Sequence, residues 1–318
     1  MKMNIVQAIN LALRQEMKRN KNVIILGEDV GEDGGVFRVT EGLAAKFGNN
    51  RVIDTPLAES CIVGAAIGMA AFGLKPVVEI QFEGFLMPAL DQLINHASRL
   101  RNRSRGRYSC PIVVRCPIGG GIKALEHHSD SPETYLIHAP GLKVVIPSTP
   151  FDAKGLLIAA IRDSDPVIFF EPKKLYRSIV EDVPEKEYVL QIGKANIIKG
   201  GKDVTLITYG SMVKTCFEAV RNLNLDVEII DLRTLSPLDT ETIFSSVQKT
   251  RKVVIVHEAP RTLGLSAEII TRISEKLDLK SFERVTGFDS VVPLRKFEEL
   301  YFPSHEKILG AVRRVSGR

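Results

Sequence analysis

Short runs of consecutive apolar residues recur along the chain, with stretches of helical periodicity between them. Runs this short and continuous are typical of strands that are buried on both faces of a sheet. We therefore predict eight strands, at residues 23–26, 76–80, 112–115, 142–146, 167–170, 204–208, 227–230 and 253–256.

The segments between these runs favour helices. The first helix is predicted from apolar residues three and four positions apart, at Val6, Ile9, Leu13 and Met17. Asn4 and Gln7 stand where a helix cap and its partner are expected. Residues 151–161 and 211–223 have a similar pattern. This alternation of strands and helices predicts an α/β fold with doubly wound, mostly parallel sheets.

The charged stretch 179–188 interrupts the pattern. It contains a proline and lacks strong periodicity, and a chain of 318 residues is long enough for two domains. We interpret the stretch as the connection between a first domain at residues 1–187 and a second at residues 188–318. An ordinary surface loop is the alternative interpretation.

Composition narrows the class of protein without identifying a function. Hydrophobic residues make up 44% and charged residues 25% of the chain, which is average for a soluble globular protein. The formal net charge of +5 is too small to predict nucleic-acid binding. The four cysteines form no C-x-x-C pair, the first residues show no signal-peptide pattern, and the run 61–74 is too short to span a bilayer. We expect a cytoplasmic protein that binds neither nucleic acid nor membrane.

The glycine run at 119–121 is the nearest approach to a nucleotide-binding motif. It loosely fits G-x-G-x-x-A, but the acidic residue expected about twenty positions later is missing at 141–144. A flexible loop is therefore the better interpretation. The chain also lacks G-x-x-x-x-G-K-[ST], H-E-x-x-H and G-x-S-x-G, which argues against the commonest NTPase, zinc-protease and serine-hydrolase classes.

Two further patterns leave alternatives open. Five arginines alternate along 99–107, a spacing that does not place them on one helix face, so a solvated or subunit-facing segment is favoured over a nucleic-acid site. Small residues, including Gly64 and Gly68, predict a thin helix over 64–71. Such a helix packs closely inside its own domain or against another subunit.

Acid–base chemistry is predicted at two places. Glu59 directly precedes the thin helix, where a poorly solvated carboxyl is suited to share a proton with a ring nitrogen. The alternative is an ordinary carboxylate at a helix N-terminus. His127 and His128 stand beside Ser129 and Asp130, a cluster suited to proton transfer, unless they are loop histidines without a role.

Longer segments of the chain resemble one family. They are LGEDV at 26–30, GGVFRVTEGL at 34–43, RVIDTPLAE at 51–59, PVVEIQF at 76–82, HHSDSPE at 127–133, PGLKVVIPSTPFDAKGLL at 140–157 and DPVIFFEPKKLYR at 165–177, followed by VTLITYGSMV, VEIIDLRTLSPLD and VVIVHEAPRTLG. Together they cover nearly the whole chain and resemble the beta subunit of thiamin-diphosphate-dependent 2-oxo acid dehydrogenases.

The resemblance implies a pyrimidine-binding domain followed by a domain like the transketolase C-terminal domain. It implies an α2β2 heterotetramer, with a second beta subunit, that binds thiamin diphosphate between unlike subunits and acylates a lipoyl-bearing acyltransferase core. Magnesium is expected from the alpha subunit, because residues 31–34 do not fit the Gly-Asp-Gly…Asn pattern that holds magnesium and diphosphate. A stand-alone transketolase-like or deoxysugar-synthase enzyme and a non-catalytic scaffold are the alternatives.

Several site residues follow from the resemblance by position. Glu59 matches the glutamate that hydrogen-bonds the pyrimidine ring nitrogen of the cofactor. Phe85 matches the aromatic residue that packs on the pyrimidine face. Leu57 and Gln81 match other residues that line the same pocket.

His128 matches the family histidine that gives a proton to the lipoyl group during acyl transfer. The segment departs from the family pattern, because Asp130 stands where glutamine is usual and His127 adds a second imidazole. The resemblance also implies a structural potassium ion held by main-chain oxygens, at Ile112, Ala160, Asp163 and Asp165.

Short segments of the sequence bear on which 2-oxo acid is the substrate. Residues 131–133 and 169–172 are closer to branched-chain 2-oxo acid enzymes, whereas 140–157 also resembles pyruvate and acetoin enzymes. We favour branched-chain 2-oxo acids, with pyruvate or acetoin as the alternative.

Overall fold

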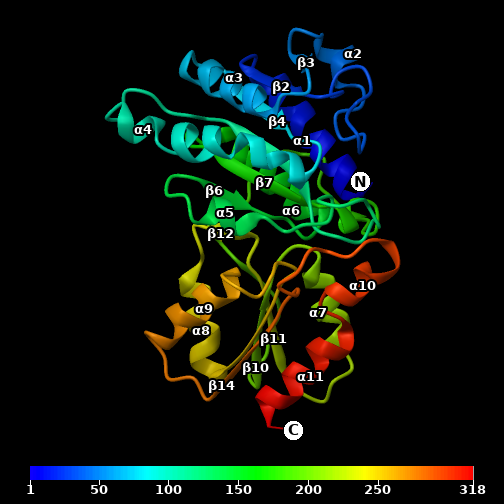
Figure 1. Cartoon of the computed structure of the whole chain (residues 1–318), viewed down its shortest axis with the longest axis vertical. Coiled ribbons are helices and arrows are strands. Elements are labelled where there is room, and N and C mark those ends of the chain that lie inside the picture. Colours follow the sequence, from blue (N-terminus) through cyan, green and yellow to red (C-terminus); the bar gives the residue numbers. More distant parts are fainter. Residues whose placement is uncertain (318) are drawn as a thin grey trace.

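Two sheets, one above the other in Figure 1, form the core of the molecule. The structure is a computed structural model that describes residues 1–317. The first sheet has seven strands in the order β12-β6-β7-β5-β4-β2-β3. Its parallel strands are β2 (Val23–Gly27), β3 (Val52–Asp54), β4 (Lys75–Glu79), β5 (Val113–Ile118), β6 (Lys143–Val145) and β7 (Val167–Pro172). The edge strand β12 (Thr234–Ser236) runs antiparallel to β6.

Helices cover both faces of this sheet. One face carries α1 (Ile5–Arg19), α6 (Pro150–Arg162) and the short α2 (Leu43–Phe47). The other face carries α3 (Glu59–Ala71), η1 (Glu83–Ala89), η2 (Gln92–Ala97), α4 (Leu100–Arg103) and α5 (Glu133–Ile137). Apolar side chains from the helices and from both faces of the strands are fully buried, as expected for a doubly wound sheet.

The first helix begins as its sequence predicts. The Asn4 side chain accepts a hydrogen bond from the Gln7 N–H, and the Gln7 side chain accepts one from the Asn4 N–H, both at 3.0 Å. This reciprocal capping box satisfies two backbone donors that a helix start leaves free. The predicted cap is therefore confirmed.

The second sheet has five strands in the order β14-β13-β10-β11-β9. They are β9 (Asn196–Lys199), β10 (Val204–Thr208), β11 (Val227–Asp231), β13 (Lys252–Val256) and β14 (Ser281–Val285), and all are parallel except β9. The helices that flank it are α7 (Met212–Val220), α8 (Thr240–Thr250), α9 (Leu265–Ser274) and α11 (His305–Ser316). Two short turns of helix, η4 (Arg295–Phe297) and α10 (Glu298–Tyr301), precede α11.

All eight predicted strands are present, and the doubly wound α/β fold is confirmed. The strands that the sequence pattern missed are short or lie at sheet edges, where one side lacks a strand neighbour. β14 is an example, because its Phe282 is 50% exposed and its pattern is not continuously apolar. Within residues 1–317, no helix is both long and apolar enough to cross a membrane.

The stretch 179–188 packs against the seven-stranded sheet and its helices, which we call the first unit; the five-stranded sheet and its helices are the second unit. Its β8 (Glu181–Asp182) pairs with β1 (Lys2–Met3), and the Val183 N–H donates to the Met1 carbonyl at 2.8 Å. The Tyr188 hydroxyl donates to the Phe151 carbonyl at 2.8 Å. These contacts fasten the stretch to the first unit, and the division near residue 187 stays a prediction.

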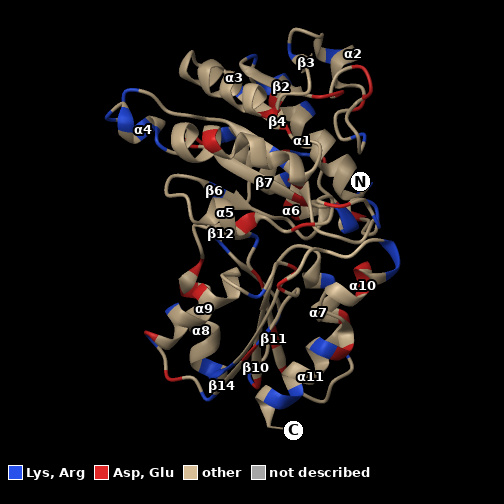
Figure 2. Ribbon diagram, in the orientation of Figure 1, with Lys and Arg blue, Asp and Glu red and all other residues tan. Residues whose placement is uncertain are grey.

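The thin helix and the arginine run both lie at the surface of the first unit. α3 buries Ile62, Val63 and Ala66 against the sheet, whereas its opposite side exposes Ala65 and Gly68. The arginine run lies around α4, where Figure 2 colours several stretches of the ribbon as basic. Its five arginines are exposed in this chain, so a solvated or subunit-facing segment stays the favoured interpretation, and a subunit contact at α3 stays a prediction.

Candidate functional site

The candidate site lies where three parallel strands end together. Gly27, Asp54 and Glu79 are the last residues of β2, β3 and β4, and they are paired in register. The segments that follow therefore meet at one edge of the sheet, the usual place for a ligand in this kind of fold. The Asp54 carboxylate ties two of them together by accepting hydrogen bonds from the N–H groups of Gly31, at 2.6 Å, and Glu32, at 3.1 Å.

Glu59 is the first residue of α3 and is partly buried at this edge. It has no hydrogen-bond partner among the residues that the structure describes, so its carboxylate is free to meet a ligand. Leu57, two residues earlier, is 82% exposed. Both predicted residues therefore lie at the sheet edge, Leu57 largely exposed and Glu59 partly exposed.

The poorly solvated carboxylate expected at Glu59 is found instead at Glu28. Glu28 directly follows β2 and is 4% exposed. Neither of its carboxylate oxygens has a partner within the described chain. Burial, together with the nearby negative charges of Glu59 and Asp29, raises the pKa of Glu28 to about 7. A protonated carboxyl is therefore accessible to this site near neutral pH.

Glu28 was missed in the sequence because a single carboxylate after a strand resembles many surface residues. The signal that could have identified it is its position immediately after the continuous apolar run 23–26, on the side of the sheet where ligands bind. Its two unpartnered acceptor oxygens, next to Glu59, fit a ring that carries N–H donors. The residues present thus suit the aminopyrimidine half of thiamin diphosphate.

Gln81 and Phe85 follow β4 and approach the site from the other side. The Gln81 amide donates to the Asp29 carboxylate at 3.0 Å, which links the segments after β2 and β4. The Phe85 ring is partly buried and lies 6.1 Å from the Phe82 ring in an edge-to-face arrangement. The two predicted residues are brought to the same edge as Glu59, although their contact with a cofactor stays a prediction.

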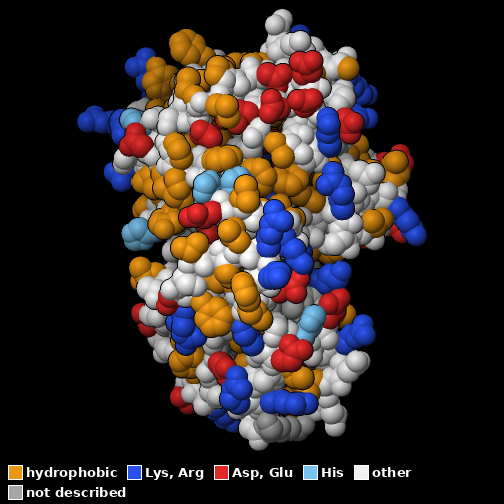
Figure 3. All heavy atoms as spheres, turned by 45° about the vertical axis from the view of Figure 1, so that its right-hand side comes forward, with side chains coloured by type: hydrophobic (Ala, Val, Ile, Leu, Met, Phe, Trp, Pro, Cys, Tyr) orange, Lys and Arg blue, Asp and Glu red, His pale blue; other side chains and the backbone are white. Residues whose placement is uncertain are grey.

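The two histidines belong to a loop that we call the histidine loop, residues 119–131. Its base is closed by a hydrogen bond from the Gly119 N–H to the Asp130 carbonyl at 2.8 Å. The His128 ring lies 4.3 Å from the Phe82 ring and 5.2 Å from the Phe85 ring. In Figure 3, histidine side chains are surrounded by hydrophobic ones on this face of the molecule. The structure thus brings the predicted residues His128 and Phe85 together, and their roles stay predictions.

Hydrogen bonding orients the His128 ring. Its Nδ1 lies 2.8 Å from the Glu126 carbonyl oxygen, which can only accept, so Nδ1 carries the proton and Nε2 faces outward. The His127 ring lies 4.8 Å from the His128 ring. Gly84 of η1 lets His127 pack closely against it, because a Cβ at Gly84 would lie 2.4 Å from the His127 carbonyl oxygen. Burial raises the pKa of Asp130 above its usual value.

A buried ion pair lies next to this aromatic cluster. Glu83 starts η1, and Lys173 starts η3 (Lys173–Leu175) directly after β7. Burial raises the pKa of Glu83 to about 7 and lowers the pKa of Lys173. The sequence analysis did not identify this pair, because its partners are far apart in the chain and only the fold brings them together.

The four predicted potassium positions lie at the opposite edge of the sheet. The Ile112 carbonyl accepts from the Val167 N–H at 3.0 Å, and the Ala160 carbonyl accepts from the Asp163 N–H at 3.2 Å. The Asp163 carbonyl lies 3.2 Å from the Lys75 ammonium. Each carbonyl keeps a second lone pair, but a cation here would lie near the charge of that lysine. The Asp165 position is likewise untested, and the potassium ion stays a prediction.

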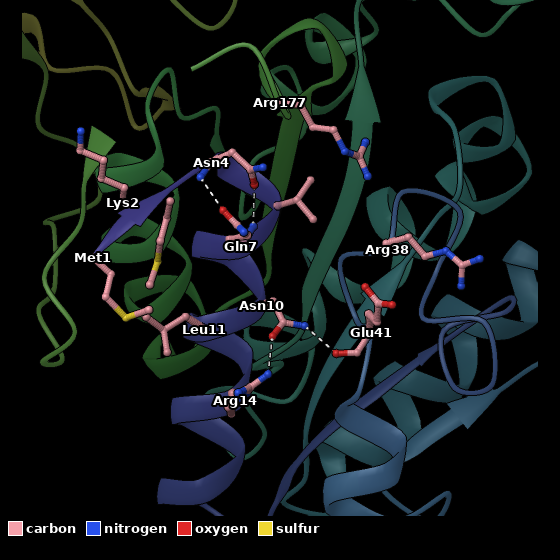
Figure 4. Close-up of a pocket in the computed structure, with 12 residues that line it drawn as sticks. Met1, Lys2, Asn4, Gln7, Asn10, Leu11, Arg14, Arg38, Glu41 and Arg177 are labelled. Carbon is pink, nitrogen blue, oxygen red and sulfur yellow. Dashed lines mark hydrogen bonds between the residues drawn. The ribbon is translucent and has the colours of Figure 1, made fainter. Parts of the chain in front are cut away.

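A groove of about 680 Å³ lies elsewhere on the first unit and is shown in Figure 4. It is bordered by the start of α1 and by Arg38, Glu41 and Arg177. None of the predicted site residues lines it. The candidate site is therefore separate from this groove.

Comparisons with known proteins cover the whole molecule. Family models described as "Transketolase, pyrimidine binding domain" and "Transketolase, C-terminal domain" match residues 1–178 and 193–308. The chain is 51% identical to the pyruvate dehydrogenase E1 component subunit beta of Acholeplasma laidlawii, over 98% of this chain and 97% of that protein. It is 48% identical to the protein of the same name from Bacillus subtilis, over 98% of each chain.

A solved structure supports the fold independently. It is described as "Split gene transketolase, inactive beta4 tetramer" and superposes with a TM-score of 0.82, covering 99% of this chain and 98% of that one. At 21% sequence identity, this likeness speaks for the fold alone.

Proposed function

Because this chain belongs to the family of E1 beta subunits of thiamin-diphosphate-dependent 2-oxo acid dehydrogenases, we propose that it provides one half of the active site of a pyruvate dehydrogenase. The observation that carries the proposal is the pair Glu28 and Glu59 at the open end of the first sheet, with two buried oxygens that lack a donor. Pyruvate is chosen over the branched-chain substrates expected from sequence segments, because the relatives described above are named for pyruvate.

The other half of the site is assigned to an alpha subunit in an α2β2 assembly. Leu57 is exposed and Glu59 only partly buried at the sheet edge, which suits a surface that a second chain completes. The sequence lacks the Gly-Asp-Gly…Asn pattern, so the diphosphate and its magnesium ion are assigned to that second chain. Its partners would also include a second beta subunit and a lipoyl-bearing acyltransferase core.

The residues of this chain would hold the pyrimidine end of the cofactor. When bound, thiamin diphosphate supplies the carbon nucleophile for the 2-oxo group and accepts the electrons released as carbon dioxide leaves. Glu59 holds the proton shared with the pyrimidine ring nitrogen, and Glu28 keeps a second proton close by. Phe85 packs on the ring face, while Leu57 and Gln81 orient it.

His128 would serve the second half of the reaction. Acyl transfer forms a bond from the acyl carbon to one sulfur of the lipoyl disulfide and breaks the sulfur–sulfur bond, so the disulfide is reduced by two electrons as the acyl unit is oxidised. The departing sulfur needs a proton. His128 can supply it from Nε2 when the ring is doubly protonated, because the Glu126 carbonyl then holds Nδ1–H and Nε2 carries the second proton.

Reconstitution tests the proposal. The purified chain is assayed for pyruvate decarboxylation alone, with the alpha subunit, and with the alpha subunit plus a lipoyl domain. We expect turnover only when both subunits and thiamin diphosphate with magnesium are present. Turnover by the chain alone would favour a stand-alone transketolase-like enzyme, and full activity of a Glu59→Ala complex would favour a non-catalytic scaffold.

A further inference from the structure

The histidine loop is fastened by a single carboxylate from the far end of the chain. Glu298 is the first residue of α10 and is 2% exposed. Its Oε1 accepts a hydrogen bond from the Gly121 N–H at 2.8 Å, and its Oε2 accepts one from the Lys123 N–H at 3.0 Å. The Ser129 hydroxyl donates to Oε1 at 3.2 Å. The carboxylate therefore binds the backbone in the first half of the loop and the Ser129 side chain near its end.

The backbone of the loop also packs directly on this segment. A Cβ at Gly120 would lie 2.2 Å from the Phe302 ring and 2.8 Å from the Glu298 carboxylate, so only glycine fits there. A Cβ at Gly119, where φ is +76°, would lie 2.4 Å from the Glu258 carboxylate. The start of the glycine run is thus shaped for contact with the second unit, a role that the motif search did not identify.

A second contact fixes the chain just beyond the loop. Glu133 follows the loop at the start of α5, and its carboxylate accepts a hydrogen bond from the Tyr209 hydroxyl at 2.6 Å. Tyr209 directly follows β10 of the second sheet. Residues of the second unit therefore hold the loop near its start and just beyond its end, and the two imidazole rings lie on its returning side next to Ser129.

We propose that Glu298 is a positioning residue for His128 and controls acyl transfer through it, an inference that rests on the proposed function. The loop has few hydrogen bonds of its own, chiefly Gly119 N–H to the Asp130 carbonyl and His128 N–H to the Leu125 carbonyl. Removing Glu298 leaves three donors without their acceptor and releases the loop. His128 then loses the fixed placement that proton delivery to a sulfur requires.

Half-reactions of the α2β2 complex test this role. Glu298→Ala is expected to lower the kcat of lipoyl-domain acylation roughly tenfold, while pyruvate decarboxylation with an artificial electron acceptor changes less than about twofold. Glu298→Gln keeps one acceptor oxygen, so its kcat for lipoyl-domain acylation is expected to lie between those of the wild type and of Glu298→Ala. Glu299→Ala is the matched control, because Glu299 is 79% exposed and meets the loop only through a 3.4 Å ion pair with the Lys123 side chain.

Tryptic cleavage after Lys123 supplies a readout that does not depend on activity. In the assembled complex, Glu298→Ala should accelerate this cleavage several-fold, whereas Glu299→Ala should leave it near the wild-type rate. Wild-type acylation and cleavage in Glu298→Ala, or equal losses in both half-reactions, would overturn the role of Glu298. A wild-type complex without pyruvate turnover would instead overturn the proposed function, and the cleavage rates would still decide whether Glu298 holds the loop.

Discussion

The Lys173 ammonium lies 2.5 and 2.6 Å from the two carboxylate oxygens of Glu83, and neither side chain is exposed to solvent. The ammonium also lies 5.7 Å from the centroid of the Phe82 ring. Since Phe82 contacts the His128 ring, this ion pair supports the aromatic layer on which the histidine rests. Two charges placed this deep in the molecule are costly unless they remain together.

Breaking this ion pair should strongly destabilise the chain. Lys173→Met leaves the Glu83 carboxylate buried without its partner and is expected to lower the free energy of unfolding by about 3–5 kcal/mol. The double variant Lys173→Met/Glu83→Leu should recover most of that loss, because no buried charge remains. Urea denaturation measures both, with Lys174→Met as the exposed neighbouring control, expected within about 0.5 kcal/mol of wild type. A single variant as stable as the control would contradict the prediction.

Glu28 should make stability depend on pH. Its pKa is about 7 in the folded chain against an ordinary value of 4.5, so the folded state binds this proton more tightly than the unfolded state does. The resulting stabilisation is complete below about pH 4.5 and is lost as the pH rises through 7.

Glu28→Gln removes this titration. Between pH 5 and pH 8 the variant should gain unfolding free energy relative to wild type, because only the wild type loses the stabilisation that comes from its bound proton. Urea denaturation of the chain at both pH values measures the difference. Parallel pH profiles for the variant and the wild type would show that this carboxylate does not titrate as inferred.

Glu59→Gln should remove most of the decarboxylation activity. The amide cannot exchange a proton with the pyrimidine ring nitrogen, so we expect kcat to fall about 10²- to 10⁴-fold in the complex with the alpha subunit. Release of carbon dioxide from pyruvate is the measurement. Glu41→Gln, an exposed change on the segment between β2 and α2, is the control and should retain wild-type activity. Comparable losses in the two variants would refute the assigned role.

Substitution of His128 should slow acyl transfer more than substitution of His127. His128→Ala is expected to slow acylation of a lipoyl domain about 10²-fold, whereas decarboxylation with an artificial acceptor changes less than about threefold. His127→Ala provides a matched comparison, because its ring lies 4.8 Å away on the same loop. If His127→Ala slowed acylation as much as His128→Ala, the proton donor could not be assigned to His128 alone.

The substrate prediction compares two 2-oxo acids on one complex. Pyruvate should give a kcat/KM at least about tenfold higher than 3-methyl-2-oxobutanoate, because a pocket shaped for a methyl group discriminates against additional methyl groups. The reverse order would restore the branched-chain substrates that the sequence segments favoured.

Sequence patterns predict the parallel strands well, because β2 is a continuous apolar run and β10 and the centre of β4 are largely apolar and buried on both faces. They fail for β12 and β14, which lie at sheet edges. The local sequence singles out Glu59 and His128 as acid–base candidates, but only the family resemblance implies a specific role for each. The structure places Glu59 at the start of α3 and His128 against the Phe82 and Phe85 rings, and their chemical roles stay predictions.

Partners that meet only in three dimensions could not be predicted. The ion pair between Glu83 and Lys173 joins residues 90 positions apart. Glu298 reaches Gly121 across 177 positions, and neither segment contains a motif that indicates the other. Glu28 differs from these, because the sequence already places it after a buried strand. Only the structure shows that its carboxylate is buried and has no hydrogen-bond donor.

The strand β12 has a consequence for how this chain can be divided. It follows β11 of the second sheet, yet it completes the edge of the first sheet by pairing with β6. A fragment that ended near residue 187 would present β6 as an open edge with unpaired backbone groups, the kind of surface through which chains aggregate. We expect such a fragment to be insoluble when it is expressed alone. We therefore expect the two units to fold and unfold together, since the second supplies an edge strand of the first sheet.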